Sequence, residues 1–260
     1  MRRYVLWLAY EGTKYAGWQR QLNASTVAGT IEACLARLFG RQVNLVGAGR
    51  TDKGVHARMQ VAHWDASEEI RLPFLGRLNS LLPGDIRALA LYEGSADFHA
   101  RHSALSRTYR YYIHQVPNPF LRAYSTYVPL PVFWDILQGA ASHLVGKRDF
   151  SAFAKEVSRY KEPVCEVYRA SWYMPQEGFC VFEIEANRFL RAMVRGLVGA
   201  QLRLAQKRIS WSLFQAALEK QSREWGMHLA PPQGLFLWEV KYSPNSLSLL
   251  ETRERVSLIC

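Results

Sequence analysis

The sequence has few of the residues that stabilise small secreted or metal-dependent proteins. Only 4 of its 260 residues are cysteine, and they form neither the paired spacing of a zinc site nor a disulfide framework. No stretch approaches the roughly 18 apolar residues of a membrane-spanning helix. The apolar run Val5–Tyr10 is also too short for the core of a secretory signal. We therefore expect reduced thiols, no membrane partner and a cytoplasmic location.

The sequence also lacks the common signatures of metal and nucleotide binding. It contains no HExxH motif, no EF-hand loop and no P-loop. The glycine-rich stretch GAGRTDKGVHA at 47–57 comes nearest, but its glycine spacing does not match the dinucleotide fingerprint. Val55 and His56 also stand where a P-loop needs Lys and Ser or Thr. We therefore expect no metal site and no nucleotide cofactor.

Acidic residues are scarce relative to basic ones, with 22 Asp+Glu against 33 Lys+Arg and a net charge of +11. By direct count, 25 of the basic residues are Arg and 8 are Lys. The guanidinium group suits phosphate because it bonds two oxygens at once and stacks on bases. The charge is spread along the chain: residues 1–110 carry 15 basic and 9 acidic groups, and residues 111–260 carry 18 and 13. This pattern favours a nucleic-acid partner, with an ordinary basic soluble protein as the alternative.

Apolar periodicity predicts an α+β protein with a largely antiparallel sheet. A proline-containing segment at 117–131 is the best candidate linker, so we expect two parts, 1–116 and 117–260. The expected strands are 4–10, 42–46, 59–64, 86–92, 107–116, 164–174, 179–186 and 235–242, and the expected helices are 27–38, 72–82, 132–145, 189–206 and 211–220.

Two groups of charged residues are candidates for function. In the 47–57 loop, Asp52 stands beside Arg50. It is either the residue of an Asx turn or an ionised nucleophile or base, and composition alone does not separate these. At the start of the helix expected at 189–206, and from the residue just before it, Arg188, Arg191 and Arg195 have the spacing of one helical face. That stripe is either an ordinary solvated face or a phosphate-binding surface.

The order of five motifs makes the chain resemble the TruA-type tRNA pseudouridine synthases. These motifs are YEGTKYAGWQRQ (10–21), GAGRTDKGVHA (47–57), DFHARHSALSRTYRY (97–111), NRFLRAMVR (187–195) and PPQGLFLWEV (231–240). The resemblance implies the pseudouridine synthase fold, in which two similar α/β halves share a largely antiparallel sheet around a central catalytic cleft. The half at 1–116 would carry the catalytic Asp loop, and the half at 117–260 would carry the Arg helix and close the cleft.

The resemblance also implies a reaction and its partners. The family isomerises uridine to pseudouridine in the anticodon stem-loop of tRNA, at positions 38–40, after the target base has flipped out of the stack. Members need no metal or organic cofactor. They act as homodimers, so the partners that we expect are tRNA and a second copy of the chain.

The resemblance assigns roles to four residues of this chain. Asp52 would be the nucleophile, attacking either C1′ of the ribose or C6 of the uracil. Arg195 would form a salt bridge with Asp52, which would keep the carboxylate charged. Tyr109 would stack on the uracil or help to remove the C5 proton. Arg50 would help to flip the target nucleotide and fill its place.

Further residues are expected in substrate binding or in support of the site. Leu235 is either a wall of the uracil pocket or a strand core residue, and RNA contacts are expected from Lys53, Arg101, Arg188 and Arg191. A structural hydrogen bond is favoured for His56, a loop-holding role for Trp18 and an ordinary cross-strand role for Tyr111. Two rival functions remain: a non-catalytic RNA-binding module, and a hydrolytic glycosidase, which would need a second carboxylate.

Overall fold

The computed structural model describes residues 1–129, 131–219, 224 and 226–252, and it divides the chain into two units. Unit 1 contains residues 1–105 and the segment that begins at Leu237, whereas unit 2 contains Ser106–Phe236. This division differs from the expected boundary at 116/117, because the strand that begins at Ser106 pairs within unit 2 and the C-terminal segment pairs within unit 1.

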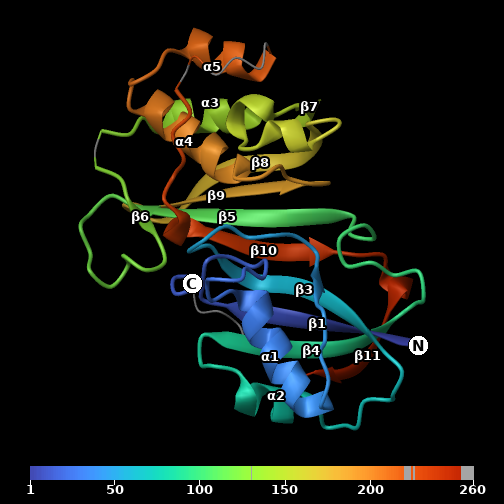
Figure 1. Cartoon of the computed structure of the whole chain (residues 1–260). Helices are drawn as coiled ribbons and strands as arrows, with labels where there is room; N and C mark the ends of the chain where they lie inside the picture. Colours follow the sequence, from blue (N-terminus) through green and yellow to red (C-terminus); the bar gives the residue numbers. More distant parts are fainter. Residues whose placement is uncertain (130, 220–223, 225, 253–260) are drawn as a thin grey trace. The chain divides into compact units, whose positions relative to one another are not determined.

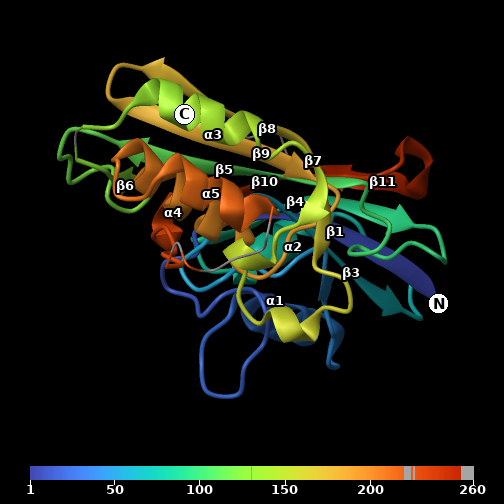
Figure 2. The same ribbon diagram turned by 90° about the horizontal axis from the view of Figure 1, so that it is seen from above.

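Unit 1 is an antiparallel sheet with helices on one face. Its strand order is β11-β4-β1-β3, and the short strand β2 also pairs with β3. Figures 1 and 2 both show its two helices on the same side of the sheet. The elements are β1 (Arg2–Tyr10), α1 (Val27–Phe39), β2 (Val46–Gly47), β3 (His56–Ala66), α2 (Leu75–Leu81), β4 (Ile86–Gly94), η4 (Pro244–Ser246) and β11 (Leu247–Thr252).

Helix α1 begins at the predicted residue and ends one residue later than predicted. The Thr26 side chain accepts a hydrogen bond from Gly29 N (3.3 Å), as expected of an N-cap. Gly40 ends the helix at φ 66°, a left-handed conformation that glycine adopts without strain. Ile31 and Leu35 are fully buried against the sheet side, so the apolar spacing of the sequence corresponds to the buried face.

Unit 2 has the strand order β5-β9-β8-β7, all antiparallel, and β6 pairs with β5 in parallel. Helices α3 and α4 lie over one face of this sheet in both views. The elements are β5 (Ser106–His114), β6 (Thr126–Tyr127), α3 (Trp134–Ser142), β7 (Gly146–Asp149), η1 (Ser151–Phe153), η2 (Val157–Arg159), β8 (Val164–Gln176), β9 (Phe179–Ala186), α4 (Met193–Ala205), α5 (Trp211–Glu219) and η3 (Pro232–Gly234). Strand β10 (Leu235–Lys241) starts in unit 2 and continues in unit 1. The α+β class with largely antiparallel pairing is therefore confirmed within each unit.

The expected start of the helix at residue 189 is wrong, because α4 begins only at Met193. Ala192, immediately before it, has φ 59°, which is outside the helical region. One residue earlier, Arg191 N donates to the Tyr160 hydroxyl (2.9 Å) instead of to a helical carbonyl. Arg188 and Arg191 therefore lie in an irregular segment, and the predicted arginine stripe along one helical face does not exist.

Strand β11 lies beyond the last element that the sequence predicts. It pairs with β4, and its Glu251 carboxylate accepts hydrogen bonds from Phe74 N (2.6 Å) and Leu75 N (3.0 Å). These amides form the start of α2, which has no side-chain cap of its own at Phe74. A carboxylate from the C-terminal strand thus satisfies donors that a helix start leaves open.

None of the helices in the described part of the chain is both long and apolar enough to cross a membrane.

Candidate active site

The loop that carries Asp52 is held by close packing against segment 12–18 of unit 1. Trp18 N donates to the Thr51 carbonyl (3.1 Å). Gly17 lies opposite with φ 103°, and a Cβ at this position would stand 2.6 Å from the same carbonyl oxygen. Only glycine satisfies both constraints, so the sequence AGW at 16–18 fixes where the loop backbone runs.

The side chains of this loop differ in burial: one is anchored in the core of unit 1 and its neighbours are partly or fully exposed. The Thr51 hydroxyl is buried and lies 2.8 Å from the Tyr10 hydroxyl. Asp52 follows at intermediate burial, and its carbonyl accepts from Val55 N (3.1 Å) in a turn. Arg50 and Lys53, on either side, are exposed. The loop therefore presents Asp52 next to a rigid anchor and between two cations.

His56 supports this loop from inside unit 1. Its ring is 1% exposed, and Nδ1 accepts a hydrogen bond from Gly12 N (3.0 Å). The Glu11 carboxylate lies 3.7 Å from the same nitrogen. The structural hydrogen bond favoured from the sequence is thus confirmed, and it joins the first motif to the second.

In unit 2, Arg195 is held by Ala230 through both its side chain and its backbone. On helix α4, its Nε donates to the Ala230 carbonyl (2.7 Å), while its own carbonyl accepts from Ala230 N (3.0 Å). A Cβ on Gly199, one turn further along α4, would overlap the carbonyl oxygen of His228. The glycine therefore allows segment 228–235 to lie directly on the helix and to orient the Arg195 guanidinium.

Tyr111 holds the other side of segment 228–235, a role that exceeds the cross-strand packing expected of it. Its hydroxyl donates to the Pro231 carbonyl (2.9 Å), so the Thr126 hydroxyl at 2.7 Å donates in turn to the phenol oxygen. Burial raises the pKa of Tyr111, whereas the Thr126 hydrogen bond and the Arg195 charge oppose that shift. The phenol therefore stays protonated at neutral pH and serves as a fixed donor.

Tyr109 and Leu235 lie within this part of unit 2. Tyr109 is on the same strand face as Tyr111, is buried, and meets the Phe189 ring edge to face at 5.0 Å. Leu235 begins β10 and is 5% exposed. Phe189 is not among the predicted site residues, although it stands in the NRFLRAMVR motif next to Arg188.

Arg101 lies in unit 1, in the turn between β4 and β5. Its N–H donates to His99 Nδ1 (3.1 Å). This turn is tied to the sheet by Ala100, whose N–H donates to His63 Nδ1 (3.2 Å) and whose carbonyl accepts from the Tyr242 hydroxyl (2.6 Å). His63 therefore fixes the backbone that carries Arg101.

We expect unit 1 to lose stability below neutral pH through His63. Burial lowers its pKa to about 4, with help from the Arg3 and His99 charges. In the unfolded chain His63 has a pKa near 6.5, so between pH 6.5 and about 4 it binds a proton in the unfolded state but not in the folded state. The free energy of unfolding therefore falls over this pH range, by up to about 3 kcal/mol. Urea unfolding at pH 7 and pH 4.5 measures this loss.

The matched variants for this test are His63→Gln, which keeps an acceptor for Ala100 N but cannot titrate, and His228→Gln at an exposed position. His63→Gln should show a shallower pH dependence than wild type, and His228→Gln should not. Equal pH dependence in all three proteins would show that His63 does not contribute.

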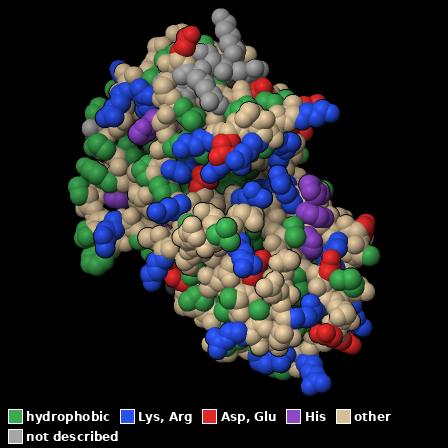
Figure 3. All heavy atoms as spheres, viewed as in Figure 1, with side chains coloured by type: hydrophobic (Ala, Val, Ile, Leu, Met, Phe, Trp, Pro, Cys, Tyr) green, Lys and Arg blue, Asp and Glu red, His purple; other side chains and the backbone are tan. Residues whose placement is uncertain are grey.

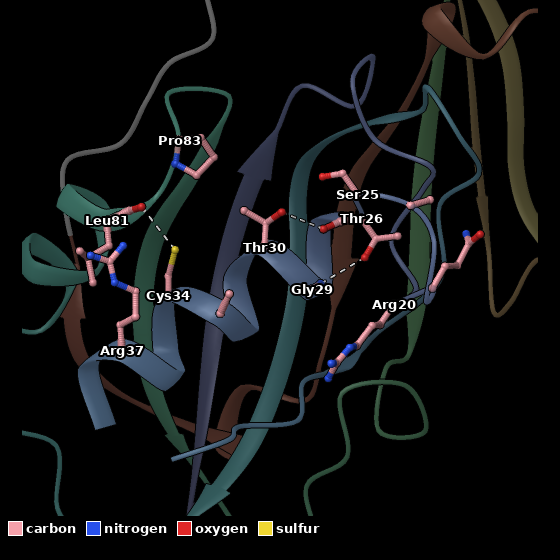
Figure 4. Close-up of a pocket in the computed structure, with 12 residues that line it drawn as sticks. Arg20, Ser25, Thr26, Gly29, Thr30, Cys34, Arg37, Leu81 and Pro83 are labelled. Carbon is pink, nitrogen blue, oxygen red and sulfur yellow. Dashed lines mark hydrogen bonds between the residues drawn. The ribbon is translucent and has the colours of Figure 1, made fainter. Parts of the chain in front are cut away.

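A hollow on unit 1 contains none of the predicted site residues. It measures about 560 Å³ and lies along α1, between the loop before the helix and the turn after α2. Figure 4 shows Arg20 and Arg37 at opposite ends of it, with the Cys34 thiol directed to the Leu81 carbonyl (3.3 Å). Among the described residues, no group of three or more His, Cys, Asp or Glu side chains is arranged to hold a metal ion.

The basic excess appears on the surface of both units. On the face shown in Figure 3, Lys and Arg side chains are distributed over both units, with fewer acidic side chains between them. The predicted residues Arg50, Lys53, Arg101, Arg188 and Arg191 are all exposed. Three of them belong to unit 1 and two to unit 2.

Comparison with known proteins agrees with the resemblance seen in the motifs. A family model described as tRNA pseudouridine synthase matches residues 7–73 and 140–243. A protein of Chlorobium luteolum named tRNA pseudouridine synthase A is 41% identical over 244 residues, which is 93% of this chain and 96% of the relative.

Proteins with the same name from two further bacteria are similarly close. The one from Bacteroides fragilis is 38% identical over 244 residues, covering 93% of this chain and 97% of its own length. The one from Porphyromonas gingivalis is 38% identical over 253 residues, covering 96% of this chain and 100% of its own length. The similarity therefore extends across both units.

Proposed function

The chain is a member of the tRNA pseudouridine synthase family, whose enzymes isomerise uridine in tRNA, and from this membership we propose that it acts on the anticodon stem-loop, at positions 38–40. In this reaction the N1–C1′ bond of the nucleoside breaks and a C5–C1′ bond forms. C5 loses a proton and N1 gains one, so the product is an isomer. We propose that the side chains of the protein carry out these steps without a cofactor.

Asp52 is the proposed nucleophile, and its placement is the observation that carries this proposal. The backbone before it is locked by Trp18 and Gly17, and the preceding Thr51 is anchored in the core of unit 1. A nucleophile gains most from being held in one geometry, because the reacting atoms then need no further ordering. The backbone contacts therefore hold the half-buried Asp52 carboxylate in one place, and this supports a role for it in covalent catalysis.

Arg195 is proposed to form a salt bridge with Asp52 in a single catalytic cleft made by the two halves of the chain. Its Nε donates to the Ala230 carbonyl (2.7 Å), so a backbone contact sets the orientation from which the guanidinium would pair with the carboxylate. An arginine oriented by a backbone carbonyl can pair with Asp52 without searching among rotamers. The pairing would favour the ionised form of the nucleophile.

The remaining predicted residues are proposed to bind the flipped nucleotide and the RNA backbone. Tyr109 would stack on the uracil or take part in removing the C5 proton, and its buried ring beside Phe189 supports a base-stacking role. Leu235 would form a wall of the pocket, and Arg50 would fill the place of the flipped base. Contacts to phosphate are proposed for Lys53, Arg101, Arg188 and Arg191. We further propose that the protein acts as a homodimer on tRNA in the cytoplasm.

Release of tritium from tRNA that contains [5-³H]uridine tests the proposed function. The C5 proton leaves during isomerisation, so the wild-type protein should release tritium into water, and pseudouridine should appear at positions 38–40 and nowhere else. Binding of tRNA without tritium release would indicate a non-catalytic RNA-binding module. Release of free uracil would instead indicate a hydrolytic glycosidase.

A further inference from the structure

Two arginines of unit 2 converge on the carboxylate of Glu156. Arg159 ends η2, in the loop 155–162 that also carries Glu156, and Arg191 lies in the loop 187–192 before α4. Arg159 Nε lies 2.8 Å from Glu156 Oε2, and Arg191 Nη1 contacts Glu156 Oε1. The side chains of Arg159 and Arg191 are 69% and 49% exposed, whereas Glu156 is 33% exposed. The carboxylate thus occupies a site that two solvent-accessible guanidinium groups create.

The two loops are also held together by contacts that do not involve the Glu156 carboxylate. Arg191 N donates to the Tyr160 hydroxyl (2.9 Å), and Lys155 N donates to the Arg191 carbonyl (2.9 Å). The Arg188 guanidinium lies 5.7 Å from the centre of the Tyr160 ring. The backbone of Arg191 would therefore keep its place if the carboxylate moved away.

Glu156 holds its position at a cost in backbone strain. Its φ of 51° and ψ of 44° are left-handed values, which glycine and asparagine adopt far more readily than glutamate. Strained residues of this kind concentrate at functional sites. Around it, the two loops carry five basic residues, Lys155, Arg159, Lys161, Arg188 and Arg191, against the two acidic residues Glu156 and Glu162. The excess of positive charge favours an anion at this surface, and Glu156 supplies one from within the chain.

We propose that Glu156 is an internal counter-ion that occupies the position of an RNA phosphodiester between Arg159 and Arg191. When tRNA docks, a backbone phosphate displaces the carboxylate and binds both guanidinium groups. This inference rests on the proposed function, because it takes tRNA to be the ligand.

The exchange is chemically balanced. A phosphodiester and a carboxylate each carry one negative charge and present two oxygens that suit the planar fork of arginine. Ion pairs at exposed sites are weak, so a phosphate can replace the carboxylate at little cost. The Glu156 carboxylate pairs with the two arginines again when the RNA dissociates. Because it competes with the phosphate, the affinity for RNA is lower than it would be if Glu156 carried no charge.

The affinity of full-length variants for tRNA at fixed ionic strength tests the proposal. Glu156→Gln removes the competing charge, and Glu156→Asn does so with a residue that tolerates the left-handed backbone, so it should fold at least as well as wild type. Both should bind tRNA about fivefold more tightly than wild type. The control Glu177→Gln removes the same charge in the exposed β8–β9 turn and should stay within about twofold.

A double-mutant cycle tests whether the gain in affinity requires both guanidinium groups. In an Arg159→Gln background, the tighter binding caused by Glu156→Asn should disappear, because one of the two guanidinium groups is gone. Affinity of the Glu156 variants equal to that of Glu177→Gln, or weaker than wild type in a folded Glu156→Asn protein, would overturn the proposal. If only the Glu156 proposal fails, the wild-type protein still releases tritium from tRNA. If the proposed function fails, the wild-type protein releases no tritium, whatever the affinities of the Glu156 variants for tRNA.

Discussion

Replacement of Asp52 by asparagine should abolish pseudouridine formation and leave tRNA binding nearly unchanged. The amide keeps the shape of the side chain but has no nucleophilic oxygen anion, so the covalent step has no attacking group. Loss of a nucleophile typically lowers turnover by at least about ten-thousandfold. The loop should keep its course, because Thr51 and Trp18 hold it through backbone and hydroxyl contacts.

Single-turnover tritium release and a filter-binding measurement on the same tRNA separate the two effects. Asp135→Asn provides the matched control, since Asp135 is an exposed aspartate in the first turn of α3. That control should retain turnover within a few-fold of wild type. Substantial tritium release by a folded Asp52→Asn protein would exclude Asp52 as the nucleophile, and loss of tRNA binding would move it to a binding role.

The features that the sequence predicts well depend on neighbouring residues. The limits of α1 follow from a threonine cap and a left-handed glycine only a few residues from the apolar stripe. The two-residue alternation of β5 likewise separates Tyr109 and Tyr111 from the opposite face of the strand. The Asp52 loop is predictable for a similar reason, since its course depends on glycines and contacts within two motifs that the sequence displays.

The features that the sequence does not predict depend on residues far along the chain. In the first turn that the sequence predicts for helix α4, Ala192 has φ 59° and the amide of Arg191 donates to Tyr160, a partner that nothing within the 187–195 motif indicates. The start of α2 depends on Glu251, more than 170 positions away. Periodicity reports which face of an element is apolar, but it does not report which distant donor or acceptor completes the element's ends.

The same limit applies to the candidate site. Arg195 stands out through its motif, yet the residue that orients it, Ala230, has no polar side chain that would draw notice in the sequence. The strand pattern predicts only ordinary packing for Tyr111, although its hydroxyl holds segment 228–235 through Pro231. The signal present in the sequence is the pair of prolines in PPQG, which restricts the backbone just before Pro232 without showing what the segment lies against.

Arg195→Ala should reduce turnover by at least about a hundredfold while tRNA affinity stays within a few-fold of wild type. In the proposed site the guanidinium pairs with a protein carboxylate and not with phosphate, so its removal raises the cost of ionising Asp52 without removing an RNA contact. Arg195→Lys should recover little activity, because one ammonium group cannot both reach the Ala230 carbonyl and present two further nitrogens to a carboxylate.

The decisive control for Arg195 lies on the same helix. Arg203 also donates from its side chain to a backbone carbonyl, that of Gly226 (2.7 Å), so Arg203→Ala removes the same charge and the same kind of hydrogen bond. If Arg195 acts on the nucleophile, its variant alone should lose kcat at saturating tRNA, and the salt dependence of binding should not change. If Arg195 instead contacts phosphate, its variant should keep kcat, bind tRNA weakly, and show a salt slope smaller by about one. The two roles therefore predict opposite changes in kcat and in the salt slope, and one pair of variants distinguishes them.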